Sequence, residues 1–119
     1  MGQFSVRVTV GNPSDPRREA DVELLVDTGA TLSWVPREVA EKIGAPHVSR
    51  SSFRLADGRT VERETSVAIF RLDGAAMGSP FVIAEPGDGC LLGATTLEAL
   101  GLGVDPIARR LFRQSLLAM

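Results

Sequence analysis

The segment Leu24-Leu25-Val26-Asp27-Thr28-Gly29 most constrains how this chain can fold, because it ends an apolar run with a carboxylate. Burying an unpaired carboxylate is costly, so a strand that enters a core has to leave it where such a residue stands. Asp27 is therefore either a turn residue at a strand end or a functional carboxylate. Hydrolysis by carboxylates usually needs two of them, and the chain has one such segment.

Short apolar stretches separated by turn residues run along the chain. Residues 4–10 alternate between apolar and polar side chains, and residues 20–26 alternate before they become apolar throughout, which predicts two strands. Residues 51–72 read as a long hairpin with Asp57-Gly58 at its turn. The other predicted strands and turns are strands at 79–85, 90–92 and 109–119, with turns at 11–19, 73–74 and 86–89.

Two short helices are also predicted. Within residues 35–44 apolar side chains recur every four positions, Pro36 suits a first helical turn, and Gly44 suits the position after the last turn. The second helix is predicted from Thr95, which has Glu98 at capping-box spacing and a glycine at its end. Many short strands with two brief helices predict an all-β domain, a closed barrel or a sandwich.

The composition of the chain indicates its number of domains, its partners and its compartment. With 119 residues and 44% apolar content, we expect one compact domain over residues 1–119. A net charge of −2 gives no electrostatic case for binding nucleic acid or an anionic membrane surface. No apolar run approaches the ~20 residues that span a bilayer, and the N-terminal residues lack a signal pattern. Cys90 is the only cysteine, which favours a cytoplasmic chain.

Three features, in this order, resemble the retropepsin-like aspartic proteases: the apolar strand ending in Asp27-Thr28-Gly29-Ala30, the Asp57-Gly58 hairpin, and Leu91-Leu92-Gly93 in a later strand. Their order and spacing are similar to those of a single-domain member across nearly the whole chain. The stretch 91–106 is similar to one in small prokaryotic members. The resemblance implies a closed β-barrel that forms one half of an acid protease. It also implies a homodimeric aspartic endopeptidase that acts on peptides or unfolded proteins and needs no metal and no organic cofactor.

The resemblance further implies that Asp27 meets its own copy across a two-fold axis. The two carboxyl groups would share one proton, a known property of aspartic-protease dyads and not an inference from this chain. The ionised Asp27 would take a proton from water while the protonated copy donates a hydrogen bond to the scissile carbonyl. Gly29 would let backbone approach the carboxylates, and the Thr28 hydroxyl would bond across to the partner chain.

The other site residues are also implied by the resemblance. A mobile hairpin would cover the bound peptide as a flap and pair with it as an added strand. Leu91 and Leu92 would pack beneath the Asp27 loop, with Gly93 at a tight crossing. The expected substrate-binding residues are Ala30 together with the flap tip Ala56, Asp57, Gly58 and Arg59.

Two positions depart from the retroviral pattern. Viral members carry an acidic residue and an arginine that form an ion pair supporting the dimer, and here these positions are Thr31 and Ala94. The terminal strands, 4–10 and 110–118, would then have to hold the subunits together. A noncatalytic retropepsin-like module that binds peptides or dimerises is the alternative function.

Several residues have simpler interpretations. Trp34 is expected in the core, His47 on the surface, and Cys90 as a buried apolar side chain and not a nucleophile. The sequence around Gly29-Ala30-Thr31 is echoed at Gly93-Ala94-Thr95, each after an apolar strand, which a duplicated unit would explain.

Overall fold

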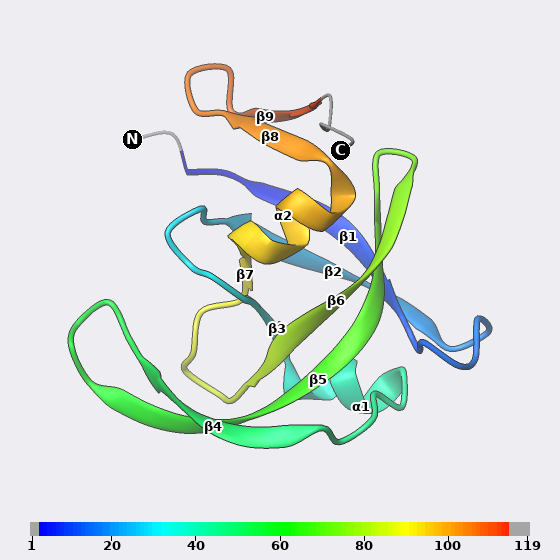
Figure 1. Cartoon of the computed structure of the whole chain (residues 1–119), viewed down its shortest axis with the longest axis vertical. Coiled ribbons are helices and arrows are strands. Elements are labelled where there is room, and N and C mark those ends of the chain that lie inside the picture. Colours follow the sequence, from blue (N-terminus) through cyan, green and yellow to red (C-terminus); the bar gives the residue numbers. More distant parts are fainter. Residues whose placement is uncertain (1–2, 115–119) are drawn as a thin grey trace, which may run out of the picture.

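The computed structural model of the chain describes residues 3–114. Strands make up most of this part, with two short helices between them (Figure 1). The elements in chain order are β1 (Ser5–Gly11), β2 (Glu19–Val26), β3 (Ser33–Pro36), α1 (Arg37–Lys42), β4 (Ser49–Arg54), β5 (Thr60–Leu72), β6 (Ala75–Ala84), β7 (Leu91–Leu92), α2 (Ala94–Leu100), β8 (Leu102–Asp105) and β9 (Arg110–Arg113).

Seven of these strands form one sheet in the order β1-β2-β7-β3-β6-β5-β4. β1 also pairs with β5, through residues 9–11 against residues 69–71, so the sheet closes on itself. β7 runs parallel to β2, and β3 runs parallel to β6, which brings loops from distant parts of the chain to the same end of the sheet. The predicted all-β class with a closed sheet is confirmed.

The core fills the inside of the closed sheet. On β1, Val8 and Val10 have no exposed surface, whereas Ser5 and Arg7 are exposed. This alternation follows from the period of two along a strand. Phe70 and Phe81 meet edge to face in the centre, with ring centroids 6.1 Å apart. The same core includes Leu92, which pairs with Val26 at the end of β2.

Besides β1, the long strand β5 pairs with two further strands. Residues 65–72 pair with β6 in the closed sheet, and residues 60–65 pair with β4, so the β4–β5 hairpin projects from one side (Figure 1). Its tip, residues 55–59, turns through Gly58 at a φ of 89°, with the Leu55 amide donating to the Arg59 carbonyl at 2.8 Å. The predicted hairpin with Asp57-Gly58 at its turn is confirmed.

The helices differ in detail from the prediction. α1 begins at Arg37, and Pro36 ends β3, a strand that the sequence did not indicate. α2 begins at Ala94 and has no side-chain cap, so the predicted Thr95–Glu98 capping box is wrong. The first amides of α2 donate instead to backbone carbonyls of the loop that follows β2, which makes a side-chain cap unnecessary.

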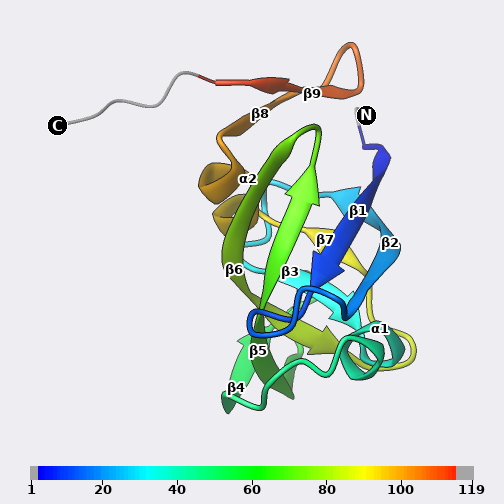
Figure 2. The same cartoon turned by 90° about the vertical axis from the view of Figure 1, so that its right-hand side faces the viewer.

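β8 and β9 form a separate antiparallel hairpin after α2, and Figure 2 shows it above the main sheet. The predicted C-terminal strand is confirmed for 110–113, β8 was not predicted, and residues 115–119 lie outside the described part of the chain. Strand 79–85 was predicted too short, because β6 begins at Ala75. Within residues 3–114, no helix has the length and apolar character needed to cross a membrane.

Candidate active site

Asp27 stands directly after β2, at the start of a loop of residues 27–32 that leads to β3. Its amide donates to the Leu92 carbonyl at 3.0 Å, and its carbonyl accepts a bond from the Ala30 amide at 3.2 Å. One carboxylate oxygen accepts the Gly29 amide at 2.9 Å, which makes a tight Asx turn. The side chain is half-buried, so the carboxylate is held by its own loop and still reaches solvent.

The parallel pairing of β2 with β7 places β7 directly against the start of this loop. Leu25 lies opposite Leu91 and Val26 opposite Leu92, so the two apolar strands end side by side. Beyond them, the amide of Ala94 donates to the Ala30 carbonyl at 2.8 Å, and the amide of Thr95 to the Thr31 carbonyl at 2.9 Å. The two Gly-Ala-Thr segments noted in the sequence are therefore bonded to each other through their backbones.

Gly93 lies where these two segments cross. A Cβ atom at this position would lie 2.6 Å from the carbonyl carbon and oxygen of Leu32 and 2.8 Å from the Ala30 oxygen. Because all three are backbone atoms of the 27–32 loop, no side-chain rotation can make room. The close approach that places Asp27 over β7 thus depends on glycine.

Three hydroxyl groups form a buried network behind the loop. Ser33 Oγ lies 2.6 Å and Ser79 Oγ 2.9 Å from Thr96 Oγ1, and the Gly93 amide donates to Ser33 Oγ at 2.9 Å. All three side chains are almost completely buried. The network joins β3, β6 and α2. The sequence carries no signal for this network, because its residues are far apart along the chain and share no motif.

Thr96→Val should lower the free energy of unfolding by about 2 kcal/mol, because valine keeps the shape but removes the hydrogen-bonding partner of two buried hydroxyls. Urea denaturation followed by fluorescence of Trp34 measures the change. Thr9→Val is the matched control, since its hydroxyl bonds Asp21 on the exposed surface, and it should cost less than about 0.5 kcal/mol. Equal losses in the two variants would contradict a special role for the buried network.

A cleft of about 750 Å³ opens in front of Asp27. Most of its lining comes from three segments: the 27–32 loop, the β4–β5 hairpin and a loop of residues 85–90 before β7. Of the predicted site residues, the cleft brings together Asp27, Gly29, Ala30, Ala56, Asp57, Arg59 and Leu91. Among the described residues, Thr28 and Gly58 are exposed outside the lining, and Leu92 and Gly93 are buried beneath it.

The cleft has an apolar wall that includes Trp34. This side chain is 9% exposed and meets Phe53 of β4 edge to face, with ring centroids 5.7 Å apart. Leu55 and Leu91 extend the same apolar cluster. The prediction that Trp34 is buried in the core is confirmed, and its indole also lines the cleft.

His47 and Cys90 are not among the described residues that line the cleft. His47 is exposed as predicted, with Nδ1 3.3 Å from Glu64 Oε1. Cys90 is half-buried, and burial raises the pKa of its thiol, which disfavours the reactive thiolate. In the described residues, no three His, Cys, Asp or Glu side chains are grouped so that they could hold a metal ion.

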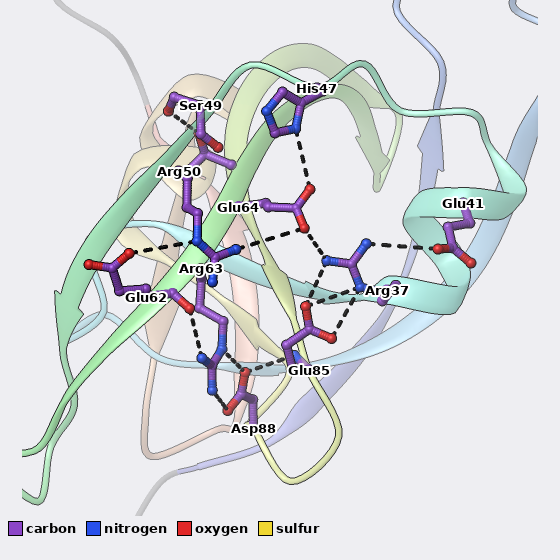
Figure 3. A network of polar contacts seen from close by, with 11 residues as sticks. Arg37, Glu41, His47, Ser49, Arg50, Glu62, Arg63, Glu64, Glu85 and Asp88 are labelled. Atoms are coloured by element: carbon purple, nitrogen blue, oxygen red, sulfur yellow. Dashed lines mark hydrogen bonds and ion pairs between the residues drawn. The ribbon is translucent and has the colours of Figure 1, made fainter.

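A cluster of charged side chains lies where α1, the β4–β5 hairpin and the 85–90 loop meet (Figure 3). Arg37 is at its centre and approaches Glu64 Oε2 and Glu85 Oε2 at 2.6 Å each. Next to it, Arg63 holds Asp88, which also lines the cleft. The sequence pattern predicts only a turn at Asp88. No local pattern predicts this pairing, because its partner is 25 residues away.

These arginines shift the titration of the carboxylates that they contact. Hydrogen bonds from Arg37 hold the pKa of Glu64 and of Glu85 below the usual 4.5. The hydrogen bonds from Arg63 hold the pKa of Asp88 below the usual 3.8. A carboxyl group with a lowered folded-state pKa stabilises the fold above its unfolded pKa, and this stabilisation is lost as the pH falls through the folded pKa.

The urea midpoint should therefore fall as the pH is lowered from about 5 toward 3, and Arg37→Gln should flatten this dependence because two carboxylates lose their partner. Urea titrations at several pH values measure both effects. Arg71→Gln is the control, since it loses only an exposed pair with Glu19 at 3.9 Å. An Arg37→Gln profile as steep as that of the control would contradict the assignment.

Comparison with known proteins adds one finding. A protein-family model described as aspartyl protease matches residues 6–105, which include the 27–32 loop, the β4–β5 hairpin and β7. A search of curated proteins found no match to the chain.

Proposed function

The chain belongs to the aspartyl protease family, and from this premise we propose that it is a homodimeric aspartic endopeptidase with one Asp27 contributed by each subunit. The observation that carries the proposal is the position of Asp27 at the base of a cleft, with a projecting hairpin lining the other side. Family membership supports aspartic protease activity in general. The dimer, the shared site and the residue roles are the parts proposed here.

The other two carboxylates of the cleft are already engaged, which supports the need for a second subunit. Asp57 accepts bonds from the Arg59 amide and guanidinium, and Asp88 is held by Arg63 and by a backbone amide. Among the described residues that line the cleft, Asp27 is the remaining carboxylate. A two-fold axis beside the 27–32 loop would supply the second carboxylate as a copy of the first.

In the proposed mechanism a water molecule lies between the two Asp27 side chains. The ionised carboxylate removes a proton from the water, and the oxygen of the water attacks the peptide carbonyl carbon. The protonated carboxyl donates its proton to the carbonyl oxygen. The tetrahedral intermediate then breaks its C–N bond, and the leaving nitrogen takes a proton from the carboxyl that received one. At the same time the other carboxylate takes a proton back from a hydroxyl of the intermediate, so the products are an amine and a carboxylic acid and the pair again holds one proton. This chemistry uses only water and carboxylates, without a metal or organic cofactor.

The neighbouring residues have proposed roles in the same site. The Gly29 amide orients one carboxylate oxygen, and the exposed Thr28 hydroxyl is free to reach the partner subunit. The β4–β5 hairpin would act as a flap, with Ala56, Asp57, Gly58 and Arg59 at its tip and an extended peptide beneath it. Closure of such a hairpin removes water from the reacting bond.

The subunit contact is proposed at the β8–β9 hairpin and the start of β1. β9 pairs with β8 alone among the described strands, which leaves one edge of β9 open for a partner strand. Ile107 is 95% exposed at the turn, and Phe112 is 44% exposed on β9. Burial of these side chains against a second copy would stabilise the dimer. The predicted contribution of residues 115–118 lies outside the described part of the chain.

We propose that the chain functions in the cytoplasm, because its single cysteine gives no intrachain disulfide. We also propose that residues 1–119 form one domain, because one apolar core connects strands from β1 to β8.

Peptide cleavage should depend on subunit concentration. Because each site needs two chains, specific activity should fall on dilution below the dimer dissociation constant, with the rate approaching the square of the concentration. Adding an excess of Asp27→Asn chains to the wild type should inhibit it, since mixed dimers hold one competent carboxylate. Cleavage of an unfolded protein across mildly acidic to neutral pH is measured alongside sedimentation. A fully active monomer at every concentration would overturn the shared site.

A further inference from the structure

An ion pair that the proposed mechanism does not use joins the β4–β5 hairpin to the opposite rim of the cleft. Arg63 lies on β5, opposite Ser51 of β4. Its Nε donates to Asp88 Oδ2 at 2.7 Å and its Nη2 to Asp88 Oδ1 at 2.9 Å, a two-pronged contact between planar groups (Figure 3). Such paired hydrogen bonds fix orientation as well as distance.

This ion pair is the most buried one among the described residues. The Arg63 side chain is 19% exposed and that of Asp88 is 10% exposed. Exposed pairs such as Arg71–Glu19 contribute little, because water screens them and the side chains must be ordered. Removing one partner of a buried pair leaves the other charge without compensation, so the contact is strongly maintained.

Asp88 also shapes the loop on which it stands. Its Oδ2 accepts the Glu85 amide at 2.8 Å, and its own amide donates to the Glu85 carbonyl at 2.9 Å. One carboxylate thus closes the 85–88 turn and binds the hairpin. Glu85 makes a second connection, because it shares Arg37 with Glu64, the residue after Arg63.

The two ends of this contact differ in their access to the cleft. Asp88 lines the cleft together with Gly87 and Gly89, whereas Arg63 is not among the described lining residues. The tip residues 55–59 lie beyond the contact, farther along the hairpin. Arg63 can therefore influence a bound peptide only through the position of the 85–90 loop and of the hairpin.

We propose that Arg63 and Asp88 are positioning residues that hold the base of the β4–β5 hairpin against the 85–90 loop and thereby set the width of the substrate cleft beside Asp27. The proposal rests on the proposed peptidase function. The contact fixes the hairpin at its base and leaves the tip free to move over the substrate. Loss of the contact widens the cleft and weakens peptide binding, while the carboxylates at Asp27 are unaffected.

Arg63→Gln, Asp88→Asn and the double variant test this through peptide kinetics below the melting temperature. Asparagine can keep an acceptor for the Glu85 amide, so Asp88→Asn removes the charge and one of the two acceptors that Arg63 uses. Each single variant should raise KM roughly ten-fold with kcat changed less than about three-fold, and the double variant should match the singles. Arg71→Gln, on the same strand and in an exposed pair, is the control and should leave KM unchanged. A KM increase in Asp88→Asn alone would overturn the proposal, because it would indicate direct contact with substrate.

Hydrogen exchange of the full chain provides a readout that does not need activity. In both single variants, amides of residues 53–59 and of residues 85–90 should exchange faster together, whereas those of residues 19–26 keep the wild-type rate. Unchanged exchange in either segment would overturn the positioning role. If the wild type cleaves no peptide, the proposed function fails, and the exchange result still decides whether Arg63 and Asp88 couple the two segments.

Discussion

Asp27→Asn should abolish peptide cleavage, with kcat lowered about 10⁴-fold or more, because an amide neither accepts a proton from water nor shares one with its copy. The substitution is nearly isosteric, and the amide oxygen can still accept the Gly29 amide bond that closes the turn. The fold, the dimer and the binding of peptide should therefore persist. The loss would be confined to the chemical step.

The measurement is cleavage of an unfolded protein and of short peptides across mildly acidic to neutral pH, with equilibrium peptide binding measured on the same samples. Asp21→Asn serves as the matched control, because Asp21 lies exposed on β2 and contacts Thr9 and Arg7 instead of the cleft. Cleavage that survives Asp27→Asn would place the catalytic group elsewhere. Peptide binding without cleavage in both the wild type and the variant would favour a noncatalytic binding module.

Gly93→Ala should give the largest loss of stability, about 3 kcal/mol or more, together with loss of activity. The added methyl group would meet backbone atoms of Leu32 and Ala30 at 2.6 to 2.8 Å. Gly93 has an ordinary φ of −94°, so the cost is steric and not one of backbone conformation. Relief of the contact requires the 27–32 loop to move away from β7, which displaces Asp27 from its position over the Leu92 carbonyl.

Urea denaturation and peptide cleavage, measured on the same preparation, test this prediction. Gly78→Ala is the matched control, because the nearest atom to its added methyl group is Ile69 Cδ1 at 3.7 Å, an ordinary contact. It should stay within about 0.5 kcal/mol of the wild type. A Gly93→Ala variant as stable and active as this control would show that the loop can yield without displacing Asp27.

Much of the fold could be predicted because its signals are local. The alternation in residues 4–10 determines which face of β1 is buried, and it needs no information from the rest of the chain. Asp57-Gly58 predicts a hairpin because a positive φ is needed there, and Gly58 has one. The capping box failed for the opposite reason. Thr95 and Glu98 have the right spacing, but the amides of α2 already have partners from a distant loop.

The sequence by itself determined the family and the β class, and it singled out Asp27 as the candidate catalytic residue, because an apolar strand that ends in Asp-Thr-Gly is a contiguous pattern. Only the tertiary structure decided what surrounds that carboxylate. The short strand β3, the Ser33–Thr96–Ser79 network and the Arg63–Asp88 contact all join residues that lie far apart along the chain. The β3 strand and the hydroxyl network form because parallel pairing of β3 with β6 brings distant segments together, whereas Arg63 meets Asp88 because β5 runs antiparallel beside β6. A hydroxyl or a charge has no local signal for its partner, because its hydrogen bond is specified by three-dimensional proximity and not by spacing in the sequence.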